Sequence, residues 1–210
     1  MVVVTGSSSG IGEATARLAS ASGAKVVVNS SSSAAEGLAL AVELGSADGR
    51  AVYVQANIAD EAGAAAIAKA AVDAFGHIDV LVNNAGTTVV IPHHNLEAVT
   101  LDVWHRILDV NVIGTWLVTM ACLPALRTSG DGSVINVTSL AGIRQAGSSI
   151  PYAVSKAALN HLTGLLAKQV GPTVRVNAVA PGLIETPWTA DWDAQHAAMK
   201  AIAPLKRCAR

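Results

Sequence analysis

The chain has 210 residues, a length that suits one α/β domain with a single core. Hydrophobic residues make up 51% and charged residues 14%, which excludes the polar, highly charged composition of disordered chains. The net charge of −1 provides no basic field for nucleic acid, and no apolar run approaches the roughly 18 residues of a membrane span. With only two cysteines and no basic leader, we expect a cytoplasmic protein.

Short β-branched runs alternate with helical stretches along the whole chain. The runs predict strands at residues 2–4, 25–29, 51–55, 78–82, 133–138 and 174–179. Helices are predicted at 11–22, 34–44, 61–75, 101–126 and 151–170, the fourth in two pieces and the second with a Ser33–Glu36 capping box. Most strands are apolar on both faces, as in a parallel sheet covered by helices. The pattern predicts one doubly wound, Rossmann-like α/β domain over residues 1–210.

A glycine-rich loop follows the first predicted strand and opens the first helix. Its glycines, Gly6, Gly10 and Gly12, have the spacing Gly-x3-Gly-x-Gly. Glycine permits a tight turn and close backbone approach to a pyrophosphate, and the helix N-terminus offers free N–H groups to it. Taken alone, the loop is a weak signal and a turn that binds no ligand is the alternative, but its position directly after the first strand favours phosphate binding.

A second group of polar residues is compatible with acid–base chemistry. Tyr152 and Lys156 share one face at the start of a helix, where the ammonium would lower the pKa of the phenol. Ser139 ends the fifth strand, at the edge where doubly wound sheets bind ligands. Asn111 lies in an otherwise apolar helix and needs a polar partner. A Tyr-x3-Lys pair alone is more often surface decoration, so the argument depends on this combination.

In their order and approximate spacing, these motifs resemble the single-domain short-chain dehydrogenase/reductase family. The resemblance adds Asn-Asn-Ala-Gly at 83–86 and Pro181-Gly182, and it covers nearly the whole chain. It implies hydride transfer between a nicotinamide cofactor and a small carbonyl or secondary alcohol substrate. Tyr152 would be the general acid/base, Lys156 would bind the nicotinamide ribose and lower the pKa of Tyr152, Ser139 would bind the substrate oxygen, and Asn111 would hold a relay water.

The same resemblance implies a set of cofactor contacts spread along the carboxyl edge of the sheet. Asn83 would in addition support the central strand. The implied contacts are Gly6, Ser8, Ser9, Gly10, Ile11, Gly12, Asn29, Ser30, Asn57, Ile58, Asn83, Ala85, Gly86, Tyr152, Lys156, Pro181, Gly182, Ile184 and Thr186.

The residues after the second strand bear on the choice of cofactor. Asn29 and Ser30 stand where a NAD site usually has an acid for the ribose 2′-hydroxyl, so we expect NADP(H) to be favoured over NAD(H). Asn57 replaces the usual aspartate of the adenine contact. The neighbours His93 and His94 point apart, and no His, Cys or Asp cluster has ligand spacing, so we expect no metal.

Several further expectations concern the family's C-terminal part and the surface. The helix and strand that usually follow in this family are expected to be absent, which would expose the edge strand at 174–179. Helices 111–126 and 151–170 would pair two copies into a homodimer or a higher homo-oligomer. Trp188 and Trp192 could form a pocket wall, pack at an interface or hold a lid. The alternative function is a nucleotide-binding regulatory or scaffold protein of the same fold without turnover.

Overall fold

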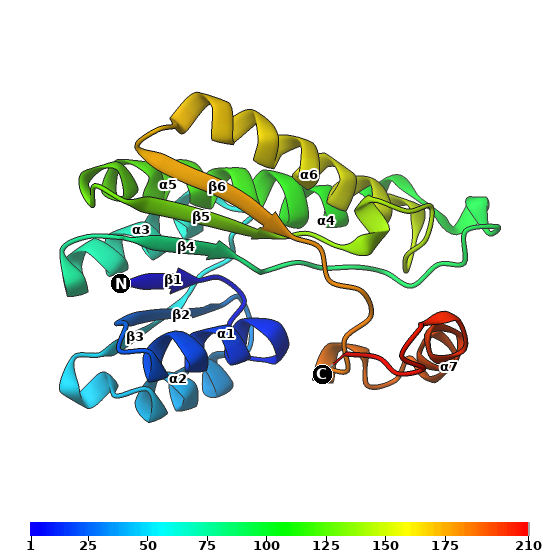
Figure 1. The fold of residues 1–210 in the computed structure, drawn as a ribbon, viewed down its shortest axis with the longest axis horizontal. Coiled ribbons are helices and arrows are strands. Elements are labelled where there is room, and N and C mark those ends of the chain that lie inside the picture. Colours follow the sequence, from blue (N-terminus) through cyan, green and yellow to red (C-terminus); the bar gives the residue numbers. More distant parts are fainter. Residues whose placement is uncertain (210) are drawn as a thin grey trace.

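Six parallel strands form one sheet in the order β3-β2-β1-β4-β5-β6 in the computed structural model, which describes residues 1–209 (Figure 1). This is the strand order of dinucleotide-binding doubly wound sheets, and it confirms the predicted fold class. The predicted strand ends agree with the structure to within two residues. The strands are β1 (Val2–Val4), β2 (Val26–Ser30), β3 (Ala51–Gln55), β4 (Val80–Asn83), β5 (Gly132–Val137) and β6 (Val174–Val179).

Helices cover both faces of the sheet because the central strands are apolar on both sides. On one face, α1 (Gly10–Ala21) and α2 (Ala34–Glu43) pack against a cluster that contains Val4. On the other face, α3 (Glu61–Phe75), α5 (Thr115–Thr128) and α6 (Ile150–Val170) form a cluster that contains Val3. Adjacent valines of one strand thus belong to opposite cores, as the alternation of side chains along a strand requires.

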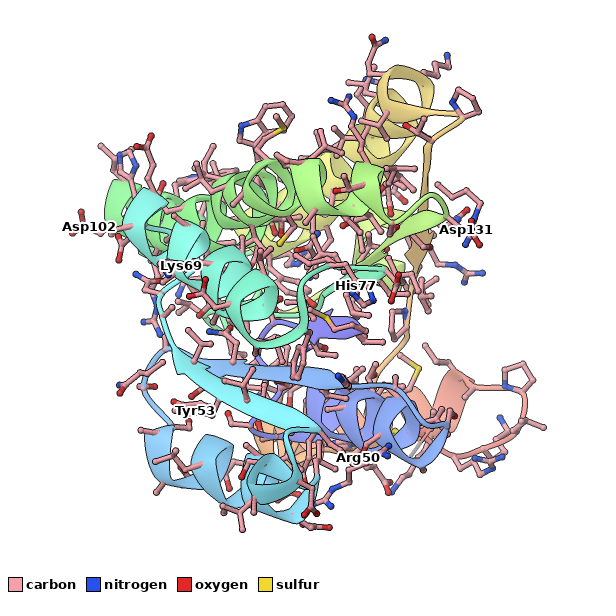
Figure 2. All side chains as sticks on the ribbon, turned by 90° about the vertical axis from the view of Figure 1, so that its left-hand side faces the viewer. Arg50, Tyr53, Lys69, His77, Asp102 and Asp131 are labelled. Atoms are coloured by element: carbon pink, nitrogen blue, oxygen red, sulfur yellow. The ribbon has the colours of Figure 1, made fainter. Side chains whose placement is uncertain are left out.

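Side chains fill the space between the sheet and the helix layers, whereas charged groups lie at the periphery (Figure 2). Lys69 and Asp131 are largely exposed. Tyr53 lies against α2, where a Cβ added at Gly37 would lie 2.2 Å from its ring, so only glycine leaves room for the ring.

The fourth predicted helix is a continuous helical run that changes its winding in the middle. It consists of α4 (Leu101–Leu108), a π-helical segment (Asp109–Gly114) and α5, so the predicted break into two α-helical pieces is replaced by a wider turn that contains Asn111. The run Leu101–Thr128 has a mean hydropathy of 1.5 over an 18-residue window and would be long enough to cross a membrane. Buried Val118, Cys122 and Leu126 show that one side of it belongs to the core.

The C-terminal part departs most from the sequence-based expectations. Helix α7 (Asp193–Ile202) was not predicted, and it lies beyond the carboxyl ends of the strands (Figure 1). The edge strand β6 ends at Val179, which is 55% exposed, and within residues 1–209 no helix covers β6 on the α1–α2 face. The predicted capping box is wrong, because Ser33 makes no side-chain cap bond; its carbonyl oxygen accepts from Ser30 instead.

Candidate active site

A single large cavity runs along the carboxyl ends of the strands, from the glycine loop to the start of α6. Its volume of about 1670 Å³ exceeds the 300–1,000 Å³ of most small-molecule sites, so it has room for a dinucleotide together with a second molecule. All the residues implied by the resemblance line this cavity except Gly12, Asn83 and Asn111.

The glycine loop allows close backbone approach at the start of α1. Gly6 and Gly10 have φ values of 59° and 58°, which favour glycine. A Cβ at Gly6 would lie 2.8 Å from Ala85 Cα, and one at Gly12 would lie 2.4 Å from Gly6 O. Gly12 therefore packs against the loop and does not line the cavity. The residues of the loop that line the cavity are Gly6, Ser8, Ser9, Gly10 and Ile11. The loop and the helix N-terminus fit the phosphates of a dinucleotide.

The side chains at the end of β2 are committed to the protein itself. Asn29 Oδ1 accepts from Gly6 N at 3.2 Å, and its Nδ2 donates to Val54 O and Ala56 O. Asn29 therefore fastens the glycine loop to β3. This engagement was not visible from the sequence, because the partners lie about 25 residues away in either direction.

The four serines at the end of β2 and directly after it differ in exposure: Ser30 is buried, Ser31 and Ser32 are exposed, and Ser33 is half-buried. Ser30 is 5% exposed, and its Oγ donates to Ser33 O and shares a hydrogen bond with Tyr53 OH at 2.8 Å. Ser31 and Ser32 are exposed and line the cavity, so their hydroxyls are the ones open to a ligand. The sequence analysis singled out Ser30 rather than these two.

Two asparagines follow the next strands of the sheet. Asn57, after β3, is exposed, and its Oδ1 accepts from Ala59 N at 3.1 Å, so its NH2 group is the part left to donate. Asn83, at the end of β4, is 4% exposed and lies outside the cavity. Its Nδ2 donates to Thr119 Oγ1 and Asn136 Oδ1, both at 2.9 Å, which ties β4 to α5 and β5. The expected support of the central sheet by Asn83 is present, whereas its expected cofactor contact stays a prediction.

Tyr152 lies in the first turn of α6 and faces the end of β5. Ser149 caps this helix and accepts from Tyr152 N at 3.4 Å. Burial raises the pKa of Tyr152 above its ordinary value, and a hydrogen bond from the Ser139 side chain lowers it only in part. The two hydroxyls are therefore close enough to bind one substrate oxygen together, with the phenol protonated at neutral pH.

Lys156 lies one turn further along α6 and is 4% exposed. Its Nζ donates to Val137 O at 2.9 Å and lies 5.7 Å from the centre of the Tyr152 ring. Burial lowers the pKa of Lys156 to about 8. The net shift of the pKa of Tyr152 is upward because desolvation of the phenol is the larger effect, and the expectation that Lys156 lowers this pKa stays a prediction.

Asn111 lies in the π-helical segment and is fully buried. Its Oδ1 accepts from Thr87 N at 2.7 Å, and its Nδ2 donates to Thr87 O at 3.0 Å and to Ser155 Oγ at 2.9 Å. Both N–H groups of the side-chain amide and one acceptor site of its oxygen thus have protein partners, and the role of Asn111 as the holder of a relay water stays a prediction. These bonds fix the loop after Gly86 against α6.

Asn160 and Gly142 hold the turn that begins at Ser139, which we call the catalytic turn, against α6. Asn160 Nδ2 donates to Gly142 O at 3.2 Å, and a Cβ at Gly142 would lie only 2.5 Å from the carbonyl carbon of Lys156. The turn that begins at Ser139 therefore lies directly on the α6 backbone. Neither residue was predicted in this role, because their contact depends on how the loop returns to the helix.

The segment after β6 closes one side of the cavity. Pro181, Gly182, Ile184 and Thr186 line it. Thr186 Cβ lies 3.5 Å from the position that a Cβ at Gly10 would take, so this segment reaches the glycine loop. Of the three roles left open for Trp188 and Trp192, the structure shows a place in the cavity wall.

The fold also brings together three side chains of the types that bind metal ions, although they are far apart in the sequence. The ligand atoms of Glu185, His196 and Cys208 lie within 4.8 Å of one another. His196 Nδ1 lies 3.4 Å from Cys208 Sγ, and Glu185 pairs with Lys200 at 3.4 Å. A backbone bond from Glu185 N to Ala209 O completes this contact. We call these residues the C-terminal clip, because they fasten the end of the chain to the segment after β6.

A dinucleotide-type sheet, a glycine loop and a group of half-buried Ser139, half-buried Tyr152 and buried Lys156 at one edge define a nucleotide-dependent oxidoreductase site. The family model described as short chain dehydrogenase matches residues 1–197. The chain belongs to the short-chain dehydrogenase/reductase family, and it is a nicotinamide-dependent oxidoreductase. Nothing in the comparisons supports a regulatory or scaffold protein without turnover.

Named relatives place the chain among carbonyl and alcohol enzymes of this family. A protein of Streptomyces violaceoruber that carries the name of a ketoacyl reductase of the granaticin polyketide synthase is 52% identical over 215 residues, covering 100% of this chain and 84% of the relative. A 3-oxoacyl-[acyl-carrier-protein] reductase of Synechocystis is 38% identical over 196 residues, covering 93% and 78%. The structure of a Brucella melitensis protein named glucose/ribitol dehydrogenase is similar with a TM-score of 0.90 and 34% identity, covering 99% and 82%.

Proposed function

We propose that this protein interconverts a ketone and a secondary alcohol with NADP(H), with Tyr152 as the general acid/base. The observation that carries the proposal is that Ser139, Tyr152 and Lys156 together line one end of a cavity whose other end is the glycine loop, with Lys156 Nζ 5.7 Å from the centre of the Tyr152 ring. The names of the relatives, among them two ketoacyl-type reductases, agree with a carbonyl substrate.

The chemistry of the reduction follows from the positions of the three polar side chains. A bound nicotinamide would supply the hydride for the carbonyl carbon. The Ser139 and Tyr152 hydroxyls would bind the carbonyl oxygen, and Tyr152, kept protonated by burial, would donate its proton to that oxygen. The Lys156 ammonium, 5.7 Å from the ring centre, would stabilise the phenolate that remains. Asn111 would act as a positioning residue that holds the loop after Gly86.

The preference for NADP(H) rests on the end of β2. In the described residues no Asp or Glu lines the cavity, so no carboxylate opposes a 2′-phosphate there. The exposed hydroxyls of Ser31 and Ser32 can donate to phosphate oxygens. Asn57 would bind adenine through its NH2 group.

We further propose a cytoplasmic homodimer built on the outer faces of α5 and α6. Exposed apolar side chains gather there: Ile113, Trp116, Met120, Val154 and Leu165 are 40–49% exposed. Leu123, Leu159 and Leu166 of the same helices belong instead to the protein's own core, where they are 5%, 2% and 6% exposed. Pairing of two copies through the remaining residues would remove this apolar surface from water.

The test combines turnover and cofactor binding in Tyr152→Phe. With NADPH and a panel of ketones, kcat should fall by about 10²- to 10⁴-fold, because the variant lacks the proton donor. The Kd of NADPH should stay within twofold, because the ring is kept. Tyr53→Phe is the control, since it removes the same oxygen from the chain's other tyrosine. A Tyr152→Phe variant that keeps more than a tenth of the rate would remove Tyr152 from this role.

A further inference from the structure

Three aromatic rings lie together beside the reacting end of the cavity. The chain has four tryptophans, two tyrosines and one phenylalanine, and three of these seven rings meet here. The Trp188 and Tyr152 ring centres are 6.4 Å apart at 70°, and the Trp188 and Trp192 centres are 6.2 Å apart at 50°. All three side chains line the cavity.

Trp188 presents much of its indole to the cavity rather than to the protein. It is 51% exposed, although it touches Tyr152 on one side and Trp192 on another. An exposed indole leaves a large apolar surface in water, which a bound apolar ring would cover. The protein's own packing therefore uses only about half of this side chain.

The turn that carries Trp188 is held rigidly. Thr189, its neighbour, is 5% exposed; its N donates to Thr186 O at 3.0 Å, and its Oγ1 donates to Ile184 O at 2.8 Å. His196 Nε2 lies 2.8 Å from Thr189 O, so the C-terminal clip braces the same turn. A wall fixed in this way does not have to be ordered when a ligand binds, which favours affinity.

The remainder of this end of the cavity is compatible with a flat apolar ligand. Its lining includes Val90, Pro92, Met199, Ile202 and Pro204. The charged side chains among the lining residues are Arg106, Arg144 and Lys156, all of them basic. A cationic substrate therefore finds no carboxylate partner in this lining, whereas a neutral or acidic ring compound meets no repulsion.

We propose that Trp188 and Trp192 form an aromatic substrate subsite that selects ketones with an aromatic ring fused to the carbonyl-bearing ring. The proposal rests on the proposed reduction at Tyr152, because the subsite places the ring next to the phenol that binds the substrate oxygen. Edge-to-face or offset stacking on Trp188 contributes about 0.5–1.5 kcal/mol beyond burial, which corresponds to roughly a 2- to 12-fold preference.

Two ketones with the same carbon skeleton distinguish the contribution of aromatic stacking from that of substrate size. 2-Tetralone has one aromatic ring, and 2-decalone has the same two fused rings without aromaticity. We expect the ratio of kcat/KM for tetralone over decalone to fall roughly 2- to 12-fold in Trp188→Leu and to stay within twofold of wild type in Trp188→Phe. The intrinsic reactivities of the ketones cancel, because the same ratio is compared between proteins. Trp104→Leu, on α4 and outside the cavity lining, is the control and should keep the wild-type ratio.

A binding measurement distinguishes failure of the subsite from failure of the reaction. In the Tyr152→Phe background, calorimetry compares 2-tetralol with 2-decalol, with and without Trp188→Leu. If neither ketone is reduced but tetralol loses its 2- to 12-fold advantage in Trp188→Leu, the subsite stands and the proposed reaction fails. If the kcat/KM ratio and the binding preference are both unaffected by Trp188→Leu, the subsite is refuted even when turnover is normal.

Discussion

Replacement of Lys156 by methionine should stabilise the protein without bound cofactor while abolishing turnover. The pKa of a lysine falls here from 10.5 to about 8 because the side chain is buried. At about 1.4 kcal/mol per pH unit, keeping the ammonium charged in this position costs about 3 kcal/mol at neutral pH. Methionine avoids that cost but leaves Val137 O without its donor, a loss of about 1–2 kcal/mol. The expected net gain is about 1–2 kcal/mol in the free energy of unfolding.

The pH dependence of the free energy of unfolding shows whether charging Lys156 destabilises the protein, and it does so independently of the energy lost at Val137 O. The unfolded chain keeps the lysine proton up to about pH 10.5, and the folded chain releases it near pH 8. Between these values the unfolded state binds more protons, so wild-type stability gains up to about 1.4 kcal/mol per pH unit as the pH rises. Burial also raises the pKa values of Cys122 and Tyr152, which opposes this trend at high pH, but both groups are shared with the variant.

Urea unfolding of both proteins between pH 7 and 9.5 measures the difference. The advantage of Lys156→Met should be largest at pH 7 and should shrink above pH 8. Lys168→Met, an exposed lysine of the same helix, should show neither effect. A variant that is less stable than wild type at pH 7, with a difference that does not change with pH, would refute the reasoning.

Three further changes test the cofactor preference, the catalytic turn and the dimer. Ser31→Asp, at an exposed hydroxyl of the cavity, should weaken NADPH binding about tenfold or more through repulsion and leave NADH less affected; equal losses for both cofactors would contradict the preference. Gly142→Ala should lower the free energy of unfolding by about 1–3 kcal/mol and lower kcat, because its Cβ would lie 2.5 Å from the α6 backbone. In the same urea unfolding, Gly164→Ala, which has open space around it, should be neutral or stabilising. Met120→Glu should yield monomers in light scattering, and Leu38→Glu, at a more exposed apolar residue of α2 (53% against 40%), should leave the dimer intact.

The fold was predictable because its signals are local. Apolar β-branched runs mark the buried strands, and Gly23 and Gly76, with φ of 90° and 81°, directly follow the helices predicted to end at residues 22 and 75. The motif residues were likewise placed at the carboxyl edge once the strands were known, since parallel strands all end there.

The hydrogen-bond partners were not predictable, because they come from distant parts of the chain. Asn29 and Asn83 read as ligand contacts in the sequence, yet one fastens the glycine loop to β3 and the other joins β4 to β5. The pKa of Tyr152 shows the same limitation. A lysine four residues away indicates a lowered value, but the depth of burial depends on how loops from elsewhere in the chain fold over the helix.

The C-terminal clip escaped prediction for a geometric reason. Its members Glu185, His196 and Cys208 are 11 and 12 residues apart, a spacing that matches no ligand motif. They meet only because α7 turns the chain back, so that Ala209 pairs with the segment beside Ile184. Because α7 itself was not predicted, neither was the group that it assembles.

The π-helical segment at Asp109–Gly114 leaves little tolerance for the insertion or deletion of a residue in this part of the chain. Each residue of an α-helix turns the chain by about 100°, so the extra residue of a π-turn decides which side of the following helix faces inward. Within this segment Asn111 points to Thr87 and Ser155, and after it Val118 and Cys122 face the core. Deletion of one residue here would force either the asparagine or the apolar stripe out of position, so relatives that share both features are expected to differ by substitution in this segment and not by insertion or deletion.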